Sequence, residues 1–172
     1  GDFDADGALD GVVSAIGDAT EASAGGGLWM WSDVVAVLSK APASPLDAAT
    51  AHVWGSTSSG QFGYRLDAAG DVDGDGYEDL LVAEPYGGTD AVGRVWLLSG
   101  ALLDGDTEVE DAALWGCEGM HTDNFIGSFI LGDADFDGDG TPDIALTALY
   151  WDTADSDTVR SGRVAVWLSS RW

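Results

Sequence analysis

The feature that most constrains this chain is a nine-residue acidic pattern that occurs three times. Each copy carries aspartates at positions 1, 3 and 5, a glycine at position 6 and a fourth aspartate at position 9. The copies are residues 2–10 (loop 1), 71–79 (loop 2) and 135–143 (loop 3). Because four carboxylates so close together repel one another, such a segment is difficult to order without a cation. The repetition in one phase therefore predicts three metal sites.

Calcium is the ion that this pattern favours. Ca²⁺ accepts about six to eight oxygen ligands in a flexible loop, whereas Mg²⁺ requires a near-ideal octahedron. The glycine at position 6 permits the positive φ that a sharp turn needs. We expect side-chain oxygens from positions 1, 3, 5 and 9 and a backbone carbonyl from position 7. The predicted ligand residues are Asp2, Asp4, Asp6, Ala8 and Asp10 in loop 1, Asp71, Asp73, Asp75, Tyr77 and Asp79 in loop 2, and Asp135, Asp137, Asp139, Thr141 and Asp143 in loop 3.

The residues that follow these loops exclude an EF-hand. An EF-hand begins in the same way but needs a bidentate glutamate at position 12 and a helix on each side. Position 12 is here Val13, Val82 or Leu146. The apolar runs 80–83 and 144–148 are short, partly β-branched and bounded by turn residues, which indicates strands. We therefore expect each loop to lead into a β-strand.

Other landmarks recur with the loops, at spacings of 69 residues from Asp2 to Asp71 and 64 residues from Asp71 to Asp135. Before loops 2 and 3 stand Gln61-Phe62-Gly63 and Asn124-Phe125-Ile126-Gly127. After these loops stand the similar segments Gly93–Ser99 and Gly162–Ser169, and Val34–Ser39 is a weaker match to them in the first unit. The first two units end with Val53-Trp54-Gly55 and Leu114-Trp115-Gly116. Each unit is thus predicted to hold four short strands, which is the content of one propeller blade.

These landmarks divide the chain into three units. The three units are residues 1–60, residues 61–123 and residues 124–172. The predicted fold is all-β, with about 2.5 to 3 propeller-type blades of four antiparallel strands. Since propellers close with about four to eight blades, we expect this segment to be part of a larger propeller or to be completed by another chain.

Composition narrows the function further. The 31 acidic and 6 basic residues give a formal net charge of −25, which excludes a nucleic-acid partner because almost nothing here can neutralise phosphates. Hydrophobic residues make up 45%, so the chain is not a disordered acidic tail. Cys117 is the only cysteine and forms no internal disulfide. No apolar run is long enough for membrane insertion.

At these landmarks the chain resembles the FG-GAP repeat family, the units of the integrin α-subunit propeller. The matching stretch in the middle unit comprises Phe62-Gly63, residues 70–85 and Gly93-Arg94-Val95. The third unit departs from the pattern, because Ile126 separates Phe125 from Gly127 and no proline follows its second strand. The resemblance implies a β-propeller in which each calcium loop joins the first and second strands of a blade, with the four aspartates of each loop as ligands. In that family's register, residues 1–60 are a partial blade that begins at its calcium loop, residues 61–123 are a complete blade, and residues 124–172 are a partial blade that lacks its last strand.

The expected function is a calcium-binding module in adhesion, recognition or surface assembly, with Ca²⁺ as a structural ion. Free calcium is abundant outside cells, so we expect an extracellular, cell-surface or periplasmic location and a protein or glycan ligand. The scattered His52 and His121 and the lack of a nucleophile elbow argue against an enzyme. Two alternatives stay open: a carbohydrate-binding or carbohydrate-active propeller, with Trp29, Trp31 and Trp151 as candidate contacts, and a subunit of a self-assembling filament.

Overall fold

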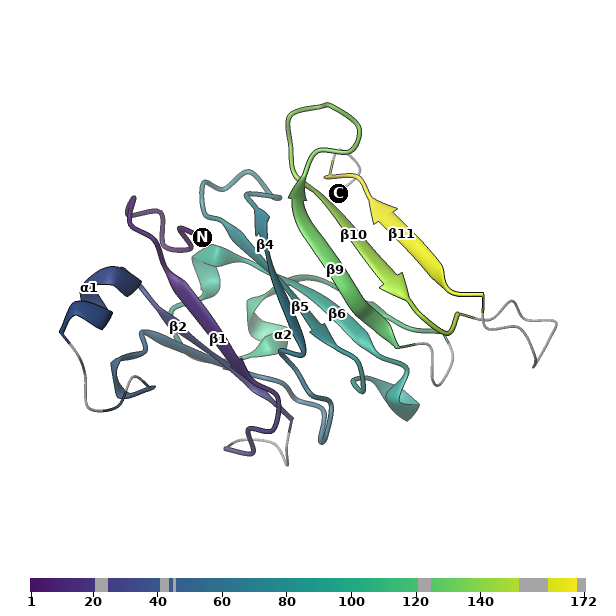
Figure 1. Ribbon diagram of the computed structural model, residues 1–172, viewed down its shortest axis with the longest axis horizontal. Coiled ribbons are helices and arrows are strands. Elements are labelled where there is room, and N and C mark those ends of the chain that lie inside the picture. Colours follow the sequence, from purple (N-terminus) through teal and green to yellow (C-terminus); the bar gives the residue numbers. More distant parts are fainter. Residues whose placement is uncertain (21–24, 41–43, 45, 121–124, 152–160, 170–172) are drawn as a thin grey trace.

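The residues that the structure describes form three β-sheets that stand side by side (Figure 1). A computed structural model describes residues 1–20, 25–40, 44, 46–120, 125–151 and 161–169. The predicted all-β fold is confirmed, because strands dominate and the described helices are short. The sheets of three or four strands are consistent with partial propeller blades. Within the described ranges, no helix has the length and apolar character needed to cross a membrane.

The order of strands within each sheet follows the repeats of the sequence, with one exception described below. The first sheet has the order β1 (Gly11–Ala15), β2 (Gly27–Trp31), β3 (Ala51–Trp54) and β7 (Gly105–Glu108). The second has the order β4 (Arg65–Gly70), β5 (Asp79–Glu84), β6 (Arg94–Leu98) and β8 (Ala113–Glu118). The third has the order β9 (Ile126–Ala134), β10 (Asp143–Ala148) and β11 (Arg163–Trp167). Every pair of neighbours except β3 and β7 is antiparallel.

The described helical elements are all short. They are α1 (Val34–Ser39), α2 (Val109–Ala112) and the 3-10 turns Leu46–Ala48, Thr89–Ala91 and Gly100–Leu102. The structure corrects the comparison of residues 34–39 with a third strand, because the strand that pairs with β1 is β2, directly before them. The Asp33 side chain accepts the Ala36 N–H and caps α1, which has no buried residue. The β-branched sequence thus forms a surface helix because β2 already occupies the place beside β1.

Strand β7 is an element that the sequence analysis did not predict. It lies between β6 and β8 in the chain, yet it pairs with β3 in parallel, so that Ala51 faces Gly105 and Trp54 faces Glu108. The connection of the second blade therefore adds a strand to the outer edge of the first sheet. The pairing of β7 with β3 links the first two sheets through main-chain hydrogen bonds.

Two hydrophobic cores lie between the sheets, one on each side of the second sheet. Leu80 and Val82 of β5 face the core shared with the first sheet, whereas Leu81 and Ala83 face the core shared with the third. Both faces of β5 are buried because side chains alternate along a strand, which explains its continuous apolar run.

The glycine of each Phe-Gly segment, Gly63 after Phe62 and Gly127 after Phe125-Ile126 (the FG motifs), lets one blade approach the preceding blade. Gly63 has φ +87°, and a Cβ placed there would lie 2.7 Å from the Cβ of Ser14 in the first sheet. Gly127 has φ +80°, and its Cβ would lie 2.7 Å from Val95 Cγ2 in the second sheet. Only glycine suits this combination of left-handed backbone and close contact. The FG motif is thus an inter-blade contact.

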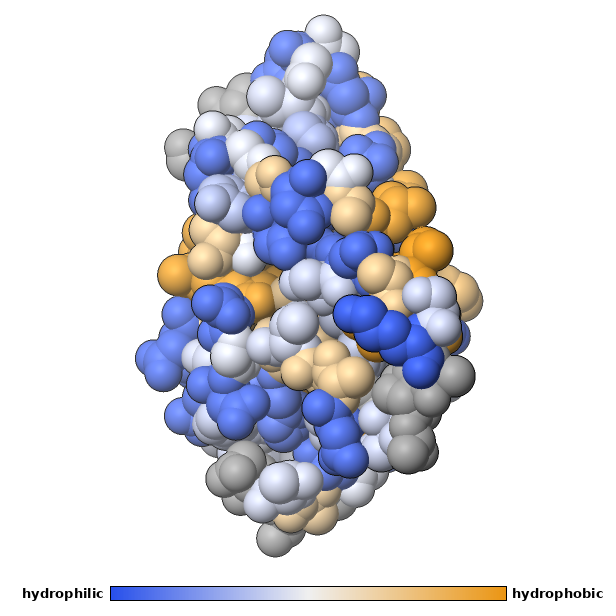
Figure 2. All heavy atoms as spheres, turned by 90° about the vertical axis from the view of Figure 1, so that its left-hand side faces the viewer, coloured by the Kyte–Doolittle hydropathy of each residue, from blue (hydrophilic) through white to orange (hydrophobic). Residues whose placement is uncertain are grey.

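The outer face of the first sheet is mainly hydrophilic. Figure 2 views the molecule from the side that carries α1 and shows apolar residues only in small separate groups on this face.

Candidate metal centres

The three acidic loops lie at the same end of the sheets (Figure 1). Loop 2 joins β4 to β5, loop 3 joins β9 to β10, and loop 1 precedes β1. Loops 1 and 2 also contact each other directly, since the Asp2 N–H donates to Glu78 Oε2 at 3.0 Å. Sequence analysis missed this role of Glu78, which no repeated motif indicates.

Hydrogen bonds from the backbone to the aspartates fold each loop. In loop 2, Gly76 N donates to Asp71 Oδ2 at 3.0 Å, Asp75 N to Asp73 Oδ1 at 3.1 Å and Tyr77 N to Asp75 Oδ1 at 2.9 Å. The corresponding bonds are Gly7 to Asp2, Asp6 to Asp4 and Ala8 to Asp6 in loop 1, and Gly140 to Asp135, Asp139 to Asp137 and Thr141 to Asp139 in loop 3. The side chains at positions 1, 3 and 5 are therefore held by hydrogen bonds from the backbone of their own loop.

In each loop, three of the predicted carboxylates converge. Their nearest oxygens lie within 4.8 Å of one another, and the groups are Asp2, Asp4 and Asp6; Asp71, Asp73 and Asp79; and Asp135, Asp137 and Asp143. Loops 2 and 3 therefore bring positions 1, 3 and 9 together, whereas loop 1 brings positions 1, 3 and 5 together. Such oxygen-only clusters suit a hard divalent cation.

Two oxygens in these clusters lack the partner that a buried atom normally has. Asp2 Oδ1 and Asp71 Oδ1, both at position 1, are buried and accept no hydrogen bond from any residue that the structure describes. A buried oxygen without a partner is costly, and a bound cation would satisfy it. The residues present therefore fit a calcium ion.

The aspartate at position 9 also links its loop to the residues that follow the next strand in the chain, which is β2 for loop 1, β6 for loop 2 and β11 for loop 3. Asp79 is fully buried, and its two oxygens accept the Val72 N–H at 2.9 Å and the Gly100 N–H at 3.2 Å. The same pair of bonds runs from Phe3 and Asp33 to Asp10, and from Phe136 and Ser169 to Asp143. Each carboxylate oxygen has a further lone pair, so these bonds leave room for a cation. The sequence analysis did not predict that the backbone N–H groups of Asp33, Gly100 and Ser169 hold the position-9 aspartates.

The environments of the loop carboxylates differ in their effect on pKa. Burial is the largest cause that raises the pKa of Asp79 to about 6, against the opposing effect of its two backbone hydrogen bonds. Burial also raises the pKa of Asp73. At Asp143 the hydrogen bond from Ser169 N–H is the largest cause and lowers the pKa. Because ligands bind a metal in the ionised form, a cation in loop 2 would displace protons from Asp79.

The histidines and tryptophans that were considered for catalysis or carbohydrate contact do not lie in the acidic loops. The ring of His52 on β3 stacks on Trp29 at 4.5 Å, and its Nε2 lies 3.5 Å from Asp18 Oδ2. Trp31 is buried, which corrects its interpretation as an exposed contact. Trp151 lies beside the third sheet and packs against the second core. His121 and Asn124 lie outside the described residues.

Blade-like sheets with an acidic loop ahead of a buried strand define a propeller-type repeat protein. A family model described as FG-GAP repeat matches residues 62–98 and 127–167. These matches contain β4 to β6 with loop 2, and β9 to β11 with loop 3. The FG-GAP model thus matches the chain at two sites, and the resemblance seen in the sequence is confirmed.

Among curated proteins, the chain is similar to integrin α chains. It is 37% identical to "Integrin alpha pat-2" of Caenorhabditis briggsae over 111 residues, which are 64% of this chain and 8% of that protein. It is 31% identical to "Integrin alpha-5" of Xenopus laevis over 96 residues, and 35% identical to "Integrin alpha-V" of Gallus gallus over 97 residues. Each of these two matches covers 55% of this chain and 9% of the relative. The chain thus spans less than a tenth of the length of these relatives.

Proposed function

We propose that this chain is a calcium-binding propeller module that acts outside the cell in adhesion or recognition. The observation that carries the proposal is the pair of buried position-1 oxygens, Asp2 Oδ1 and Asp71 Oδ1, which lack hydrogen-bond partners inside convergent carboxylate clusters. The FG-GAP matches and the similarity to integrin α chains support the extracellular, adhesion-type role. The relatives are animal proteins, and animal cells have no periplasm, so an extracellular or cell-surface location is favoured over a periplasmic one.

Each loop is proposed to bind one Ca²⁺, with the fifteen ligand residues predicted above and with residues 1–60, 61–123 and 124–172 as the three repeat units. The ion is structural in this proposal. It screens the carboxylates and fixes the turn that leads into β1, β5 or β10. Nothing in this role requires a reacting substrate, and we propose that the module is not an enzyme.

Thermal unfolding in calcium and in chelator tests the proposal. A ligand at about 100 times its Kd stabilises the folded state by about 2.7 kcal/mol for each site. For a chain of this size, that corresponds to a rise in Tm of about 5–10 °C. We expect the rise in CaCl2 but not in equimolar MgCl2, and native mass spectrometry should find three calcium ions. Equal Tm values in CaCl2 and EGTA would contradict the proposal.

A matched pair of variants separates the loop from general charge effects. Asp71→Asn should abolish calcium binding in loop 2, since it alters the oxygen that has no hydrogen-bond partner. Asp47→Asn removes the same charge from an exposed 3-10 turn outside the loops and should leave the calcium-induced rise in Tm unchanged. If both variants lose the same part of the calcium response, the sites are not those described here.

The recognition role requires its own measurement. The labelled chain should bind members of an extracellular protein array in CaCl2, and the signal should fall in EGTA as the module loosens. A glycan array tested in parallel separates the protein ligand that we favour from the carbohydrate alternative. Binding only to glycans would overturn the adhesion proposal.

A further inference from the structure

Loops 1 and 2 are joined by a reciprocal pair of hydrogen bonds. The Asp2 N–H donates to Glu78 Oε2 at 3.0 Å, and the Glu78 N–H donates to the Asp2 carbonyl oxygen at a longer 3.4 Å. Asp2 is position 1 of loop 1, and Glu78 is position 8 of loop 2, between the predicted ligands Tyr77 and Asp79. The contact therefore connects a predicted ligand of one loop with the residue between two predicted ligands of the other.

One peptide group of loop 2 takes part in both the contact and the predicted metal site. The Glu78 N–H belongs to the same peptide group as the Tyr77 carbonyl, which is the predicted backbone ligand of loop 2. This group is trans and planar, so its N–H and C=O point in opposite directions. The bond from the Glu78 N–H to Asp2 therefore sets the direction of the Tyr77 carbonyl. Conversely, when the Tyr77 carbonyl is held as a ligand, the same rigidity holds the Glu78 N–H against Asp2.

The two loops also pack on a shared residue at the end of β6. Phe3, position 2 of loop 1, is buried in the core between the first two sheets. Gly100 follows β6 and donates its N–H to Asp79 of loop 2. A Cβ at Gly100 would overlap the carbonyl oxygen of Glu78 and would lie 2.9 Å from the carbonyl oxygen of Phe3. A shift of loop 1 would therefore disturb the residue that holds Asp79.

We propose that loops 1 and 2 bind calcium as a coupled pair and that Glu78 is the residue that couples them. This inference rests on the calcium binding proposed above and concerns how the sites act on one another. A filled loop 2 holds the peptide group between Tyr77 and Glu78, and Glu78 in turn holds Asp2, whose Oδ1 is buried without a hydrogen-bond partner among the described residues. Glu78 is thus a positioning residue and not a ligand. By reciprocity, each site strengthens the other by the same factor.

Loops 2 and 3 meet at the corresponding place but without these hydrogen bonds. A Cβ at Gly70, directly before loop 2, would lie 2.6 Å from Cγ of Pro142, which is position 8 of loop 3. A Cβ at Gly1, directly before loop 1, would lie 2.6 Å from Glu78 Oε2, so the two contacts correspond. Proline has no N–H and its side chain has no acceptor, so neither bond can form at Pro142. We therefore expect loop 3 to bind calcium independently of loop 2.

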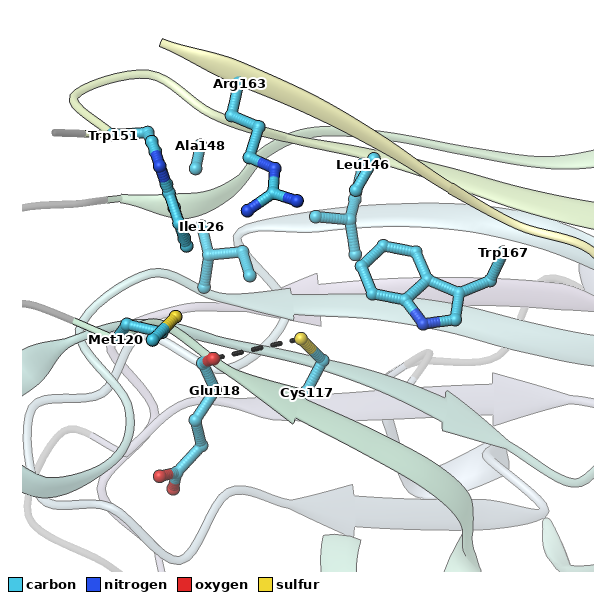
Figure 3. A pocket seen from close by; sticks show the side chains of 10 residues that line it. Cys117, Glu118, Met120, Ile126, Leu146, Ala148, Trp151, Arg163 and Trp167 are labelled. Carbon is cyan, nitrogen blue, oxygen red and sulfur yellow. Dashed lines mark hydrogen bonds between the residues drawn. The ribbon is translucent and has the colours of Figure 1, made fainter. Parts of the chain in front are cut away.

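The sheets that carry loops 2 and 3 are also joined differently from the first two. Strand β7 pairs with β3 and so links the first two sheets, whereas no described strand pairs across the second and third sheets. A cavity of about 220 Å³ lies between β8 and the third sheet. Figure 3 shows Leu146 and Trp167 on one side of this cavity and Cys117 on the other. Loop 3 is therefore a suitable internal reference for the coupling of loops 1 and 2.

Charge alone predicts the opposite effect of one site on the other. A filled loop 2 holds four aspartates and one Ca²⁺, whereas an empty loop 2 with Asp71→Asn holds three aspartates and no ion. The empty variant loop is the more negative of the two, so by charge it would strengthen calcium binding at the neighbouring loop 1. Weaker binding at loop 1 in this variant would therefore come from the contact through Glu78. In about 0.15 M NaCl the charge effect is limited further, since the Debye length is about 8 Å.

Calcium titration of the full chain by ¹H–¹⁵N NMR follows each loop separately. Gly7, Gly76 and Gly140 donate their N–H groups to the position-1 aspartates of loops 1, 2 and 3, so their signals should shift as each loop fills. In Asp71→Asn, the Gly76 shift should be lost, and Gly7 should need about fivefold more calcium, which is the effect of one partly exposed hydrogen bond. The Gly140 titration should be unchanged. Asp2→Asn should weaken loop 2 by the same factor.

Variants at Glu78 test the route of the coupling. The Glu78 side chain is 43% exposed, so its replacement should not prevent folding. Glu78→Ala removes the acceptor of the Asp2 N–H, so loop 1 should bind about fivefold more weakly, and adding Asp71→Asn should then weaken it by less than about twofold. Glu78→Gln keeps an acceptor oxygen without the charge, so loop 1 should still depend on loop 2. The matched control Glu108→Ala, at an exposed glutamate of β7, should titrate as the original chain does.

Several results would overturn the coupling. If Asp71→Asn abolishes the Gly76 shift while Gly7 titrates as before or more tightly, the sites are independent or interact only by charge, and calcium binding itself still stands. If Glu78→Gln loses the coupling as fully as Glu78→Ala, the hydrogen bond is not its route. An equal loss in Glu108→Ala would show that the effect is not specific to Glu78. If none of the three glycine signals shifts with calcium, the proposed calcium binding fails, and the coupling fails with it.

Discussion

The buried position-9 aspartates provide the sharpest test of how the loops are joined to the blades. In Asp79→Ala, the N–H groups of Val72 and Gly100 lose the carboxylate that accepts them at 2.9 and 3.2 Å. Hydrogen bonds to a charged group contribute about 1.5–3 kcal/mol each, so loss of both should cost the variant about 3–6 kcal/mol. That is a large part of the total stability of about 5–15 kcal/mol for a domain.

The matched control is Asp75→Ala in the same loop. Asp75 is exposed and accepts the Tyr77 N–H at 2.9 Å, so its removal should cost less than about 1 kcal/mol without calcium. Both variants should be compared with the original chain by urea unfolding in EGTA, followed by tryptophan fluorescence. In CaCl2, Asp75→Ala should lose the calcium-induced stabilisation of loop 2.

Should Asp79→Ala fail to fold, Asp79→Asn gives the same test with a smaller effect. Its amide oxygen can accept one of the two N–H groups, so a loss of about half the alanine value is expected. Equal losses for the Asp75 and Asp79 variants in EGTA would refute the reasoning, because position 9 would then act only through the ion.

Three further predictions concern the rest of the fold. Burial is the main cause that raises the pKa of Glu84, whose Oε1 accepts no hydrogen bond from the described residues. The protonated Glu84 side chain therefore contributes stability below the ordinary pKa of a glutamate, and this contribution is lost as the pH rises through the raised pKa. Glu84→Gln should thus be more stable than the original chain by about 1 kcal/mol at pH 7.5, and the difference should vanish toward pH 4.5 in urea unfolding. Phe62→Ala should cost about 3–5 kcal/mol because Phe62 is fully buried between the first two sheets, whereas the exposed Phe129→Ala should cost less than about 1 kcal/mol; comparable urea midpoints would argue against an inter-blade core. Gly63→Ala should lower the Tm more than Gly105→Ala, since both glycines have a left-handed φ but only Gly63 has another blade within contact of the new Cβ; equal shifts would indicate that backbone strain alone matters.

Much of the local structure follows from the sequence. Short apolar runs bounded by turn residues predict β5 and β10, and the landmarks that recur around the loops predict the strands beside them, because both signals lie within short segments of the chain. The acidic loops can also be predicted, because the glycine and the aspartates occupy the same positions in each copy and form their hydrogen bonds within nine residues. The buried run of β5 indicates in addition that both faces of the second sheet are covered.

Other features depend on contacts between residues far apart in the chain. Residues 34–39 have a strand-like composition but form α1, since β2 takes the position beside β1. Strand β7 has no apolar pattern and is held by main-chain pairing with β3, fifty-four residues earlier when counted from Gly105 to Ala51. No local pattern could place Gly100 N–H on Asp79, because that bond spans 21 residues and forms only when β6 ends beside loop 2.

The repeat, the acidic loops and the strands that follow them can be predicted from the sequence, because each depends on chemistry within about ten residues. The pairing of strands in each sheet and the buried oxygens that accept no hydrogen bond from the described residues become known only from the folded structure. Those outcomes depend on how sheets pack across two cores, and burial of that kind is a property of the assembled blades rather than of any one segment.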